Sequence, residues 1–128
     1  LDKIIKMRQD NADYISSKLS KHPQIKIPNS IPGYKNIYQM YTIRLFDKKT
    51  RDRLQGFLSK KRIFSKVYFD PIHLKAFYQE KFNMKKGMLP ITEKISEQVL
   101  TLPMYPNMTL EEKNYLVDSI SEYFDENN

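Results

Sequence analysis

His73 is the residue of this sequence whose type and position best suit a chemical role. It lies in the segment VYFDPIHL (67–74), directly after a predicted strand end and a proline turn. Loops at strand ends carry binding and catalytic groups more often than the elements that they connect. A neutral imidazole there can donate a hydrogen bond to a phosphate or a sugar hydroxyl, or take up a proton. The residues alone equally favour a structural imidazole that caps the turn, so both interpretations stay open.

The composition of the chain excludes most other kinds of catalytic site. The chain has no cysteine, which excludes disulfides, thiolate metal sites and cysteine nucleophiles, and two histidines are too few for an all-histidine metal site. No glycine-rich phosphate loop, metal-ligand cluster or nucleophile elbow occurs. Glu111 and Glu112 are adjacent, so on a helix they diverge and form a poor carboxylate pair. His22, beside Pro23, indicates a structural role at a helix end.

Positive charge is concentrated in one stretch of the chain. The sequence has 22 basic and 15 acidic residues, a net charge of +7, and residues 48–66 account for all of that excess. Such a block can attract phosphate or nucleic acid, and nine Tyr with seven Phe would suit base stacking. A solvated helix with basic residues near its C-terminal dipole explains the block more simply. No RNA-binding motif or zinc-finger spacing supports the first interpretation.

The length of the chain and its hydrophobic periodicity limit which helices and strands can position these residues. A chain of 128 residues with 40% apolar residues favours one domain with a real core, and no apolar run is long enough to span a bilayer. No signal peptide is visible. Periodicity and turn signals predict the following elements: helix 1–21, strand 37–46, a helix capped by Asp47 or Thr50, strand 66–69, a short helix 73–80, helix 91–98, strand 99–102, and a final helix that a capping box at Thr109 and Glu112 begins. We therefore predict an α/β (α+β) fold with a small mixed or antiparallel sheet of about three strands and helices packed on it.

Helical periodicity begins at the first residue. Leu1, Ile4 and Ile15 fall on one face of the predicted first helix, and no capping residue precedes them. The simplest explanation is a longer helix severed from sequence upstream. Arg8 lies in the middle of this apolar stripe, with Asn11 beside it. Arg8 is therefore either an anchor that ties the helix to a loop or a contact to a missing part of the parent protein.

Six segments, in order, resemble one protein family. They are RQDNADY (8–14), YTIR (41–44), RDRL (51–54), VYFDPIHL (67–74), LPITE (89–93) and LTLPMYPNMT (100–109). Together they resemble the C-terminal part of the DegT/DnrJ/StrS sugar aminotransferases, which use pyridoxal phosphate. The resemblance covers nearly the whole chain.

The resemblance implies an enzyme whose large domain holds the cofactor through a Schiff-base lysine. It implies glutamate as amino donor, a nucleotide-linked keto sugar as acceptor, a cytoplasmic homodimer with active sites at the subunit interface, and a place in polysaccharide biosynthesis. Residues 1–128 would be the small C-terminal domain, with residues 1–21 the end of an interdomain helix. Because nothing here matches the family's lysine domain, we expect this chain alone to be inactive and to bind neither cofactor nor metal. We also expect an exposed apolar patch where the large domain docks.

The resemblance assigns two substrate-binding candidates. His73 matches the family position that faces the nucleotide sugar, and Tyr68 is the second candidate. Two positions depart from the family: Lys75 replaces the glutamine after the His-Leu pair, and Arg62 replaces a glycine before the second strand. The alternative function is a basic, non-catalytic module that binds nucleic acid or another protein.

Overall fold

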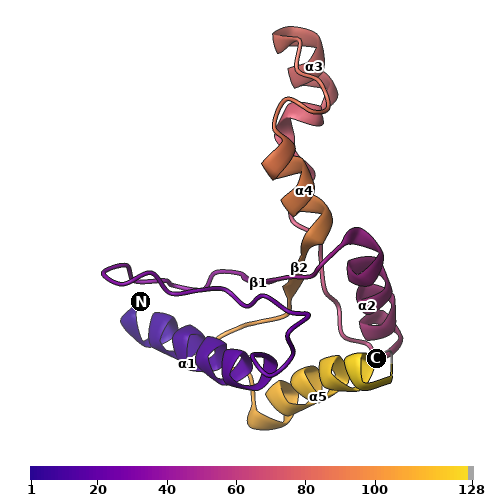
Figure 1. The fold of residues 1–128 in the computed structure, drawn as a ribbon. Coiled ribbons are helices and arrows are strands. Elements are labelled where there is room, and N and C mark those ends of the chain that lie inside the picture. The colour runs from indigo at the N-terminus through magenta and orange to yellow at the C-terminus, as the bar shows by residue number, and fades with distance from the viewer. Residues whose placement is uncertain (127–128) are drawn as a thin grey trace.

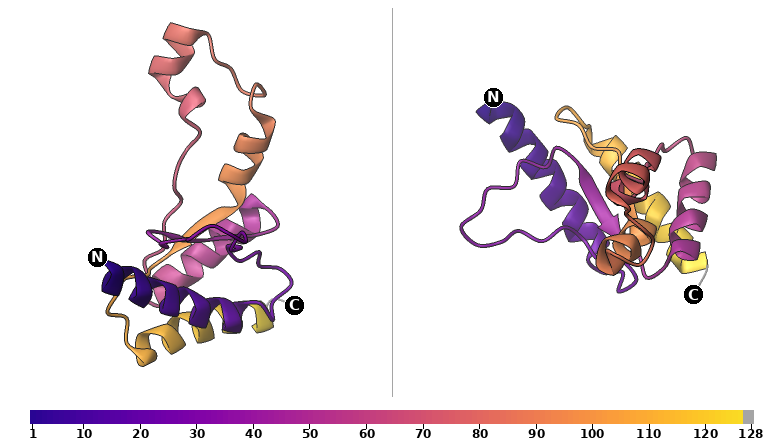
Figure 2. Two further views of the ribbon diagram at one scale, coloured as in Figure 1. Left: turned by 90° about the vertical axis from the view of Figure 1, so that its left-hand side faces the viewer. Right: turned by 90° about the horizontal axis from the view of Figure 1, so that it is seen from above.

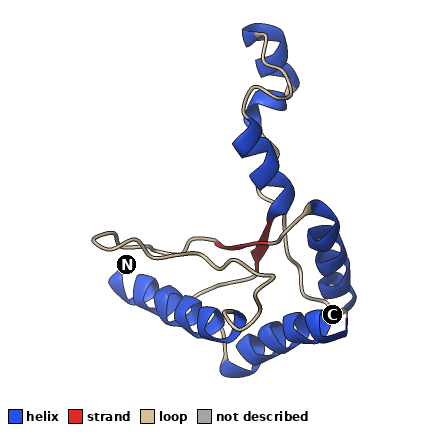
Figure 3. Ribbon diagram, viewed as in Figure 1, coloured by secondary structure: helices blue, strands red, loops and turns tan. Residues whose placement is uncertain are grey.

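The computed structural model describes residues 1–126, which form a layered body and a projecting arm (Figure 1). The elements in chain order are α1 (Asp2–Leu19), β1 (Tyr41–Arg44), α2 (Lys48–Lys60), the 3₁₀ turn η1 (Ile72–Leu74), α3 (Ala76–Phe82), α4 (Pro90–Gln98), β2 (Val99–Leu102) and α5 (Leu110–Glu126). We call residues 70–98 the arm, and it contains η1, α3 and α4. The predicted α/β (α+β) fold with helices packed on a small sheet is confirmed, and most of its regular structure is helical (Figure 3).

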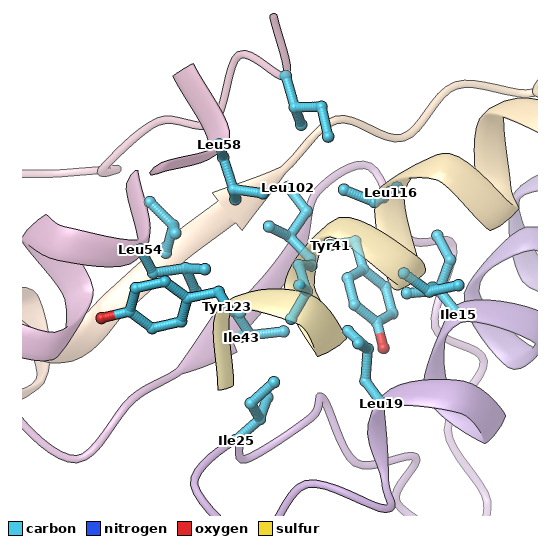
Figure 4. Close-up of a cluster of buried hydrophobic side chains, with 14 of the residues drawn as sticks. Ile15, Leu19, Ile25, Tyr41, Ile43, Leu54, Leu58, Leu102, Leu116 and Tyr123 are labelled. Carbon is cyan, nitrogen blue, oxygen red and sulfur yellow. The ribbon is translucent and has the colours of Figure 1, made fainter. Parts of the chain in front are cut away.

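The sheet pairs β1 with β2 in antiparallel register. Tyr41 lies opposite Leu102, and Ile43 lies opposite Leu100. Because side chains alternate along a strand, these four apolar residues share one face. All four are buried against α1, α2 and α5, which cover that face of the sheet (Figures 1 and 4). The arm rises from the other side of the sheet (Figure 2).

The prediction of about three strands is wrong, because the sheet that residues 1–126 form has two. Lys66 forms only an isolated bridge with Thr101, through backbone hydrogen bonds of 2.9 and 2.7 Å. Antiparallel pairing would next place Val67 and Tyr68 opposite Leu100 and Val99, but Lys66 is the one residue of segment 66–69 that exchanges backbone hydrogen bonds with β2. The chain instead leaves the sheet toward the arm, where Pro71 has no amide hydrogen to donate. Segment 66–69 therefore pairs with the sheet at one position.

Two other predicted boundaries also differ from the structure. Strand 37–46 is reduced to 41–44, since Tyr38 has a φ of +46°, which an extended strand cannot accommodate. The predicted helix 73–80 is divided into η1 and α3, because Lys75 between them is extended, with φ −80° and ψ 142°.

Helix starts follow the sequence signals closely. Asp47 is the N-cap of α2, and its Oδ1 accepts a hydrogen bond of 2.7 Å from the Thr50 amide. The capping box is confirmed: the Thr109 amide donates to Glu112 Oε2 at 2.8 Å, and the Glu112 amide donates to Thr109 Oγ1 at 3.1 Å. Short-range capping depends on residues three apart, which is why the sequence predicts it well.

Arg8 is an anchor between α1 and a loop. Its Nη1 donates to the carbonyl oxygens of Tyr38 and Gln39 at 3.0 and 3.2 Å. Asn11 nearby is buried, and its Nδ2 donates to the carbonyl oxygen of Tyr105 at 2.9 Å. The anchor interpretation of Arg8 is therefore confirmed.

The basic stretch is built mainly into α2. Arg51 is only 5% exposed, and its guanidinium donates to Asp52 Oδ1 at 2.6 Å and to the Val99 carbonyl at 3.3 Å. Lys61 pairs with Glu122 of α5 at 2.6 Å. These two cations hold the helix in place, as expected for a packed helix with a solvated outer face. Among residues 1–126, each helix is too short or too polar to cross a lipid bilayer.

Arg62 occupies a glycine-type backbone position at the end of α2. Its φ is +59°, its amide donates to the Ser59 carbonyl at 3.0 Å, and the Ile63 amide donates to the Leu58 carbonyl at 2.9 Å. This pair of bonds is a Schellman motif, in which glycine is the favoured left-handed residue. Arg62, which replaces the glycine of the family, thus adopts the backbone conformation that glycine prefers.

We expect Arg62→Gly to raise the free energy of unfolding by about 1 kcal/mol, because glycine adopts positive φ without the steric cost that a Cβ brings. Urea denaturation followed by circular dichroism measures the change. Arg62→Ala is the matched control, since it removes the charge and keeps the Cβ, and it should give little or no gain. Equal stabilisation by both substitutions would contradict the backbone explanation.

Candidate functional site

The arm is the part of the described chain that lacks a core of its own. Neither α3 nor α4, both fully described, contributes a buried side chain. The rings of Phe77, Tyr78 and Phe82 contact one another on the arm, with centroids 5.3 to 6.2 Å apart. The large apolar arm residues that are more than half exposed are Ile72, Phe77, Phe82, Met88 and Ile91. Exposed apolar surface of this extent is typical of a face that another protein surface covers.

We expect this exposed surface to make the isolated chain self-associate at high protein concentration. Analytical ultracentrifugation over a concentration series measures the effect as a rising weight-average mass. Replacing Phe77 and Ile91 by serine should reduce it, because both side chains are mostly exposed and support no core. A single monomeric species at every concentration would contradict the prediction.

His73 lies on η1, at the base of the arm, and is 5% exposed. Its Nε2 is 2.9 Å from Oε1 of Glu93 on α4. This hydrogen bond joins two segments that are 20 residues apart in the sequence. The imidazole is therefore held by a carboxylate at Nε2, and a ligand can reach only the small exposed part of the ring.

Glu93 is the centre of the hydrogen bonding in this region. Besides His73, its carboxylate accepts from the Gly87 amide at 2.8 Å to Oε1 and 3.0 Å to Oε2, and from the Leu89 amide at 3.4 Å. The hydrogen bond from His73 is the largest influence that lowers the pKa of Glu93, the two backbone amides lower it further, and desolvation opposes them. Because that pKa is lowered on folding, the stabilisation is present at neutral pH and is lost as the pH falls through the folded-state value.

Tyr68, the second candidate, lies away from this hydrogen-bond cluster. It lines an open hollow of about 250 Å³ over the sheet with Lys66 and Thr101, and His73 does not line that hollow. The Lys66 ammonium is 5.9 Å from the centroid of the Tyr68 ring. The structure thus places Tyr68 over the sheet and His73 on the arm, without bringing the two into one pocket.

His22, the other histidine, and Lys75, the other departure from the family, both have structural partners. His22 is buried, and its Nε2 is 2.9 Å from Ser121 Oγ, with burial as the main cause of its lowered pKa. The structural role that the sequence indicated for His22 is confirmed. Lys75 pairs with Asp70 at 2.7 Å on the surface of the arm.

Comparison with known proteins decides the family. The model of the DegT/DnrJ/EryC1/StrS aminotransferase family matches residues 1–121. The chain belongs to this family. The resemblance seen in the sequence is therefore confirmed.

Two curated relatives show how much of a family member this chain represents. The pleiotropic regulatory protein of Geobacillus stearothermophilus is 35% identical over 98 residues, which cover 76% of this chain and 25% of the relative. A dTDP-3-amino-3,6-dideoxy-alpha-D-galactopyranose transaminase of Aneurinibacillus thermoaerophilus is 26% identical over 124 residues, 96% of this chain and 32% of the relative. The chain thus spans about a quarter to a third of the length of these two family members.

A solved structure agrees with the fold. DesV of S. venezuelae, determined in complex with a ketimine intermediate, superposes with a TM-score of 0.87 at 26% identity, over 95% of this chain and 32% of that chain. The body and the arm together therefore correspond to about a third of the DesV chain.

The described residues do not fit the pyridoxal phosphate cofactor by themselves. An imine-forming lysine needs a desolvated setting that lowers its pKa, and no lysine among residues 1–126 is buried. The sequence also lacks a glycine-rich phosphate loop.

Sequence reasoning identified His73 but did not assign its partner. Glu93 appeared only as the last residue of the LPITE segment. The usable signal was a glutamate in the first turn of a helix that starts at Pro90, shortly after Gly87. Nothing in the sequence placed that carboxylate against an imidazole 20 residues earlier.

Proposed function

We propose that this chain is the small C-terminal domain of a pyridoxal-phosphate-dependent aminotransferase that transfers an amino group, with glutamate as donor, to a nucleotide-linked keto sugar. The observation that carries the proposal is the family match over residues 1–121 in a chain that spans 25% to 32% of two curated relatives. One of those relatives is a transaminase whose name specifies a dTDP-linked amino sugar. DesV with its ketimine supports the same chemistry.

In this proposal the large domain supplies the lysine and the cofactor, and this chain supplies the lid over the sugar side of the site. Residues 1–21 form the end of an interdomain helix, which is consistent with the exposure of Leu1 at 90% and Ile4 at 48%. The exposed apolar side of the arm docks on the large domain. The intact enzyme is a cytoplasmic homodimer that serves polysaccharide biosynthesis.

His73 and Tyr68 are the residues that we propose to contact the substrate. His73 is fixed by Glu93, and Tyr68 offers a phenol beside the Lys66 ammonium. A phenol next to a cation suits a phosphate or a sugar oxygen as ligand. The two residues would then contact different parts of an extended ligand, in accordance with their separate positions.

The coding sequence upstream of Leu1 provides the first test. We expect it to encode a cofactor domain with an imine-forming lysine. The protein made from the whole reading frame should bind pyridoxal phosphate, seen by its absorbance, and transaminate a nucleotide-linked keto sugar with glutamate. Residues 1–128 alone should do neither. An unrelated upstream domain, or imine formation by residues 1–128 alone after borohydride trapping, would contradict the proposal.

A further inference from the structure

The surroundings of Glu93 determine which nitrogen of His73 carries the proton. Oε1 of Glu93 accepts from His73 Nε2 at 2.9 Å and from the Gly87 amide at 2.8 Å, and Oε2 lies 3.0 Å from the same amide. Three donors therefore converge on this carboxylate when the 3.4 Å contact from the Leu89 amide is included. Backbone amides can only donate, so the Glu93 carboxylate is the acceptor in its hydrogen bonds with Gly87 and Leu89.

An ionised carboxylate has no proton to give, so the His73–Glu93 bond needs its hydrogen on Nε2. The lowered pKa of Glu93 agrees with this arrangement, because the same donors stabilise the charged form. In a neutral imidazole with Nε2 protonated, Nδ1 carries a lone pair and is an acceptor. The second ring nitrogen is thereby left to accept a hydrogen bond rather than donate one.

We propose that Glu93 is a positioning residue that holds His73 in the Nε2–H form, so that Nδ1 accepts a hydrogen bond from a hydroxyl of the sugar substrate. This inference rests on the proposed function for the identity of the ligand, but the tautomer itself does not. It narrows the roles open to the neutral imidazole, because an ionised phosphate oxygen needs a donor and Nδ1 in this form offers none. A hydroxyl can donate to Nδ1 and is abundant on a sugar.

Gly87 makes the arrangement sensitive to the shape of the arm. Its φ is +92°, a conformation that favours glycine, and its amide contacts both oxygens of Glu93. The turn before α4 and the imidazole on η1 are therefore fixed by one carboxylate.

Nitrogen NMR of the imidazole rings tests the inference on residues 1–128. The chain has two histidines, so the spectra are simple, and His22→Gln identifies which signals belong to His73. At a pH where titration of the same spectra shows neutral rings, we expect the Nε2–H form of His73 to exceed the Nδ1–H form at least about tenfold, because hydrogen bonds to charged acceptors are strong. Glu93→Gln should reduce that ratio severalfold, since an amide can donate as well as accept.

Glu97→Gln is the matched control, because Glu97 is exposed on the same helix and undergoes the same change of charge. It should leave the His73 tautomer unchanged. A dominant Nδ1–H form in the natural sequence would overturn the inference, as would an unchanged ratio in Glu93→Gln. If Glu93→Gln disorders the arm, the tautomer of His73 measured in the natural sequence still decides whether the inference holds. A negative result here leaves the upstream-sequence test of the proposed function unaffected.

Discussion

Leu54→Ala should lower the free energy of unfolding by about 3 kcal/mol, the middle of the range for a fully buried leucine. Leu54 lies on α2, is 0% exposed, and points into the core beside Tyr123 (Figure 4). The truncation removes apolar contacts and leaves a cavity that close-packed neighbours cannot fill. For a domain of this size the melting temperature should fall by about 10 °C. Urea denaturation and calorimetry measure the two quantities.

Leu110→Ala is the control for that experiment. Leu110 lies at the start of α5 and is 58% exposed, so the same chemical change should cost well under 1 kcal/mol. A similar cost at both positions would mean that the sheet, α2 and α5 do not form the core described above.

His73→Ala, made in the protein encoded by the whole reading frame, should raise the KM for the nucleotide-linked sugar by up to about tenfold. The reason is the loss of one hydrogen bond to the substrate, worth about 0.5 to 1.5 kcal/mol. Cofactor binding, followed by absorbance, should change little, because we propose that the lysine domain holds the cofactor. Steady-state kinetics with the sugar varied at saturating glutamate give the KM.

The matched comparison for His73→Ala is His22→Gln, which removes the other imidazole from its buried position against Ser121. Any fall in stability that it causes should leave the KM for the sugar unaltered. An unchanged KM in His73→Ala, with cofactor binding intact, would rule out a substrate contact for His73. A parallel rise of KM in His22→Gln would show that general loosening of the fold, rather than a ligand contact, explains the effect.

Local signals predicted the helices better than the strands. The Thr109–Glu112 box and the Asp47 cap depend on residues three apart, and both occur as expected. The strands depend on partners far along the chain. Segment 66–69 has suitable β-branched and aromatic residues, but after the single bridge at Lys66 the chain leaves β2 and enters the arm, so these residues form no strand.

In the candidate site, too, local signals were predictable from the sequence and long-range contacts were not. The turn signals around His73 predicted its place at the end of an extended segment. Its partner Glu93 was not predictable, because the contact depends on how the arm folds back on itself, and no periodicity specifies that distance. Tyr68 was assigned from the same segment, yet the turn between the two residues places them on different surfaces.

The isolated bridge between Lys66 and Thr101 lies close to the start of β2 at Val99. The intervening segment therefore leaves the sheet and rejoins it at nearly the same place. Closing a longer loop costs only slightly more chain entropy than closing a shorter one. Changes in the length of the chain between these two points should therefore disturb the helices beneath the sheet less than changes within the body.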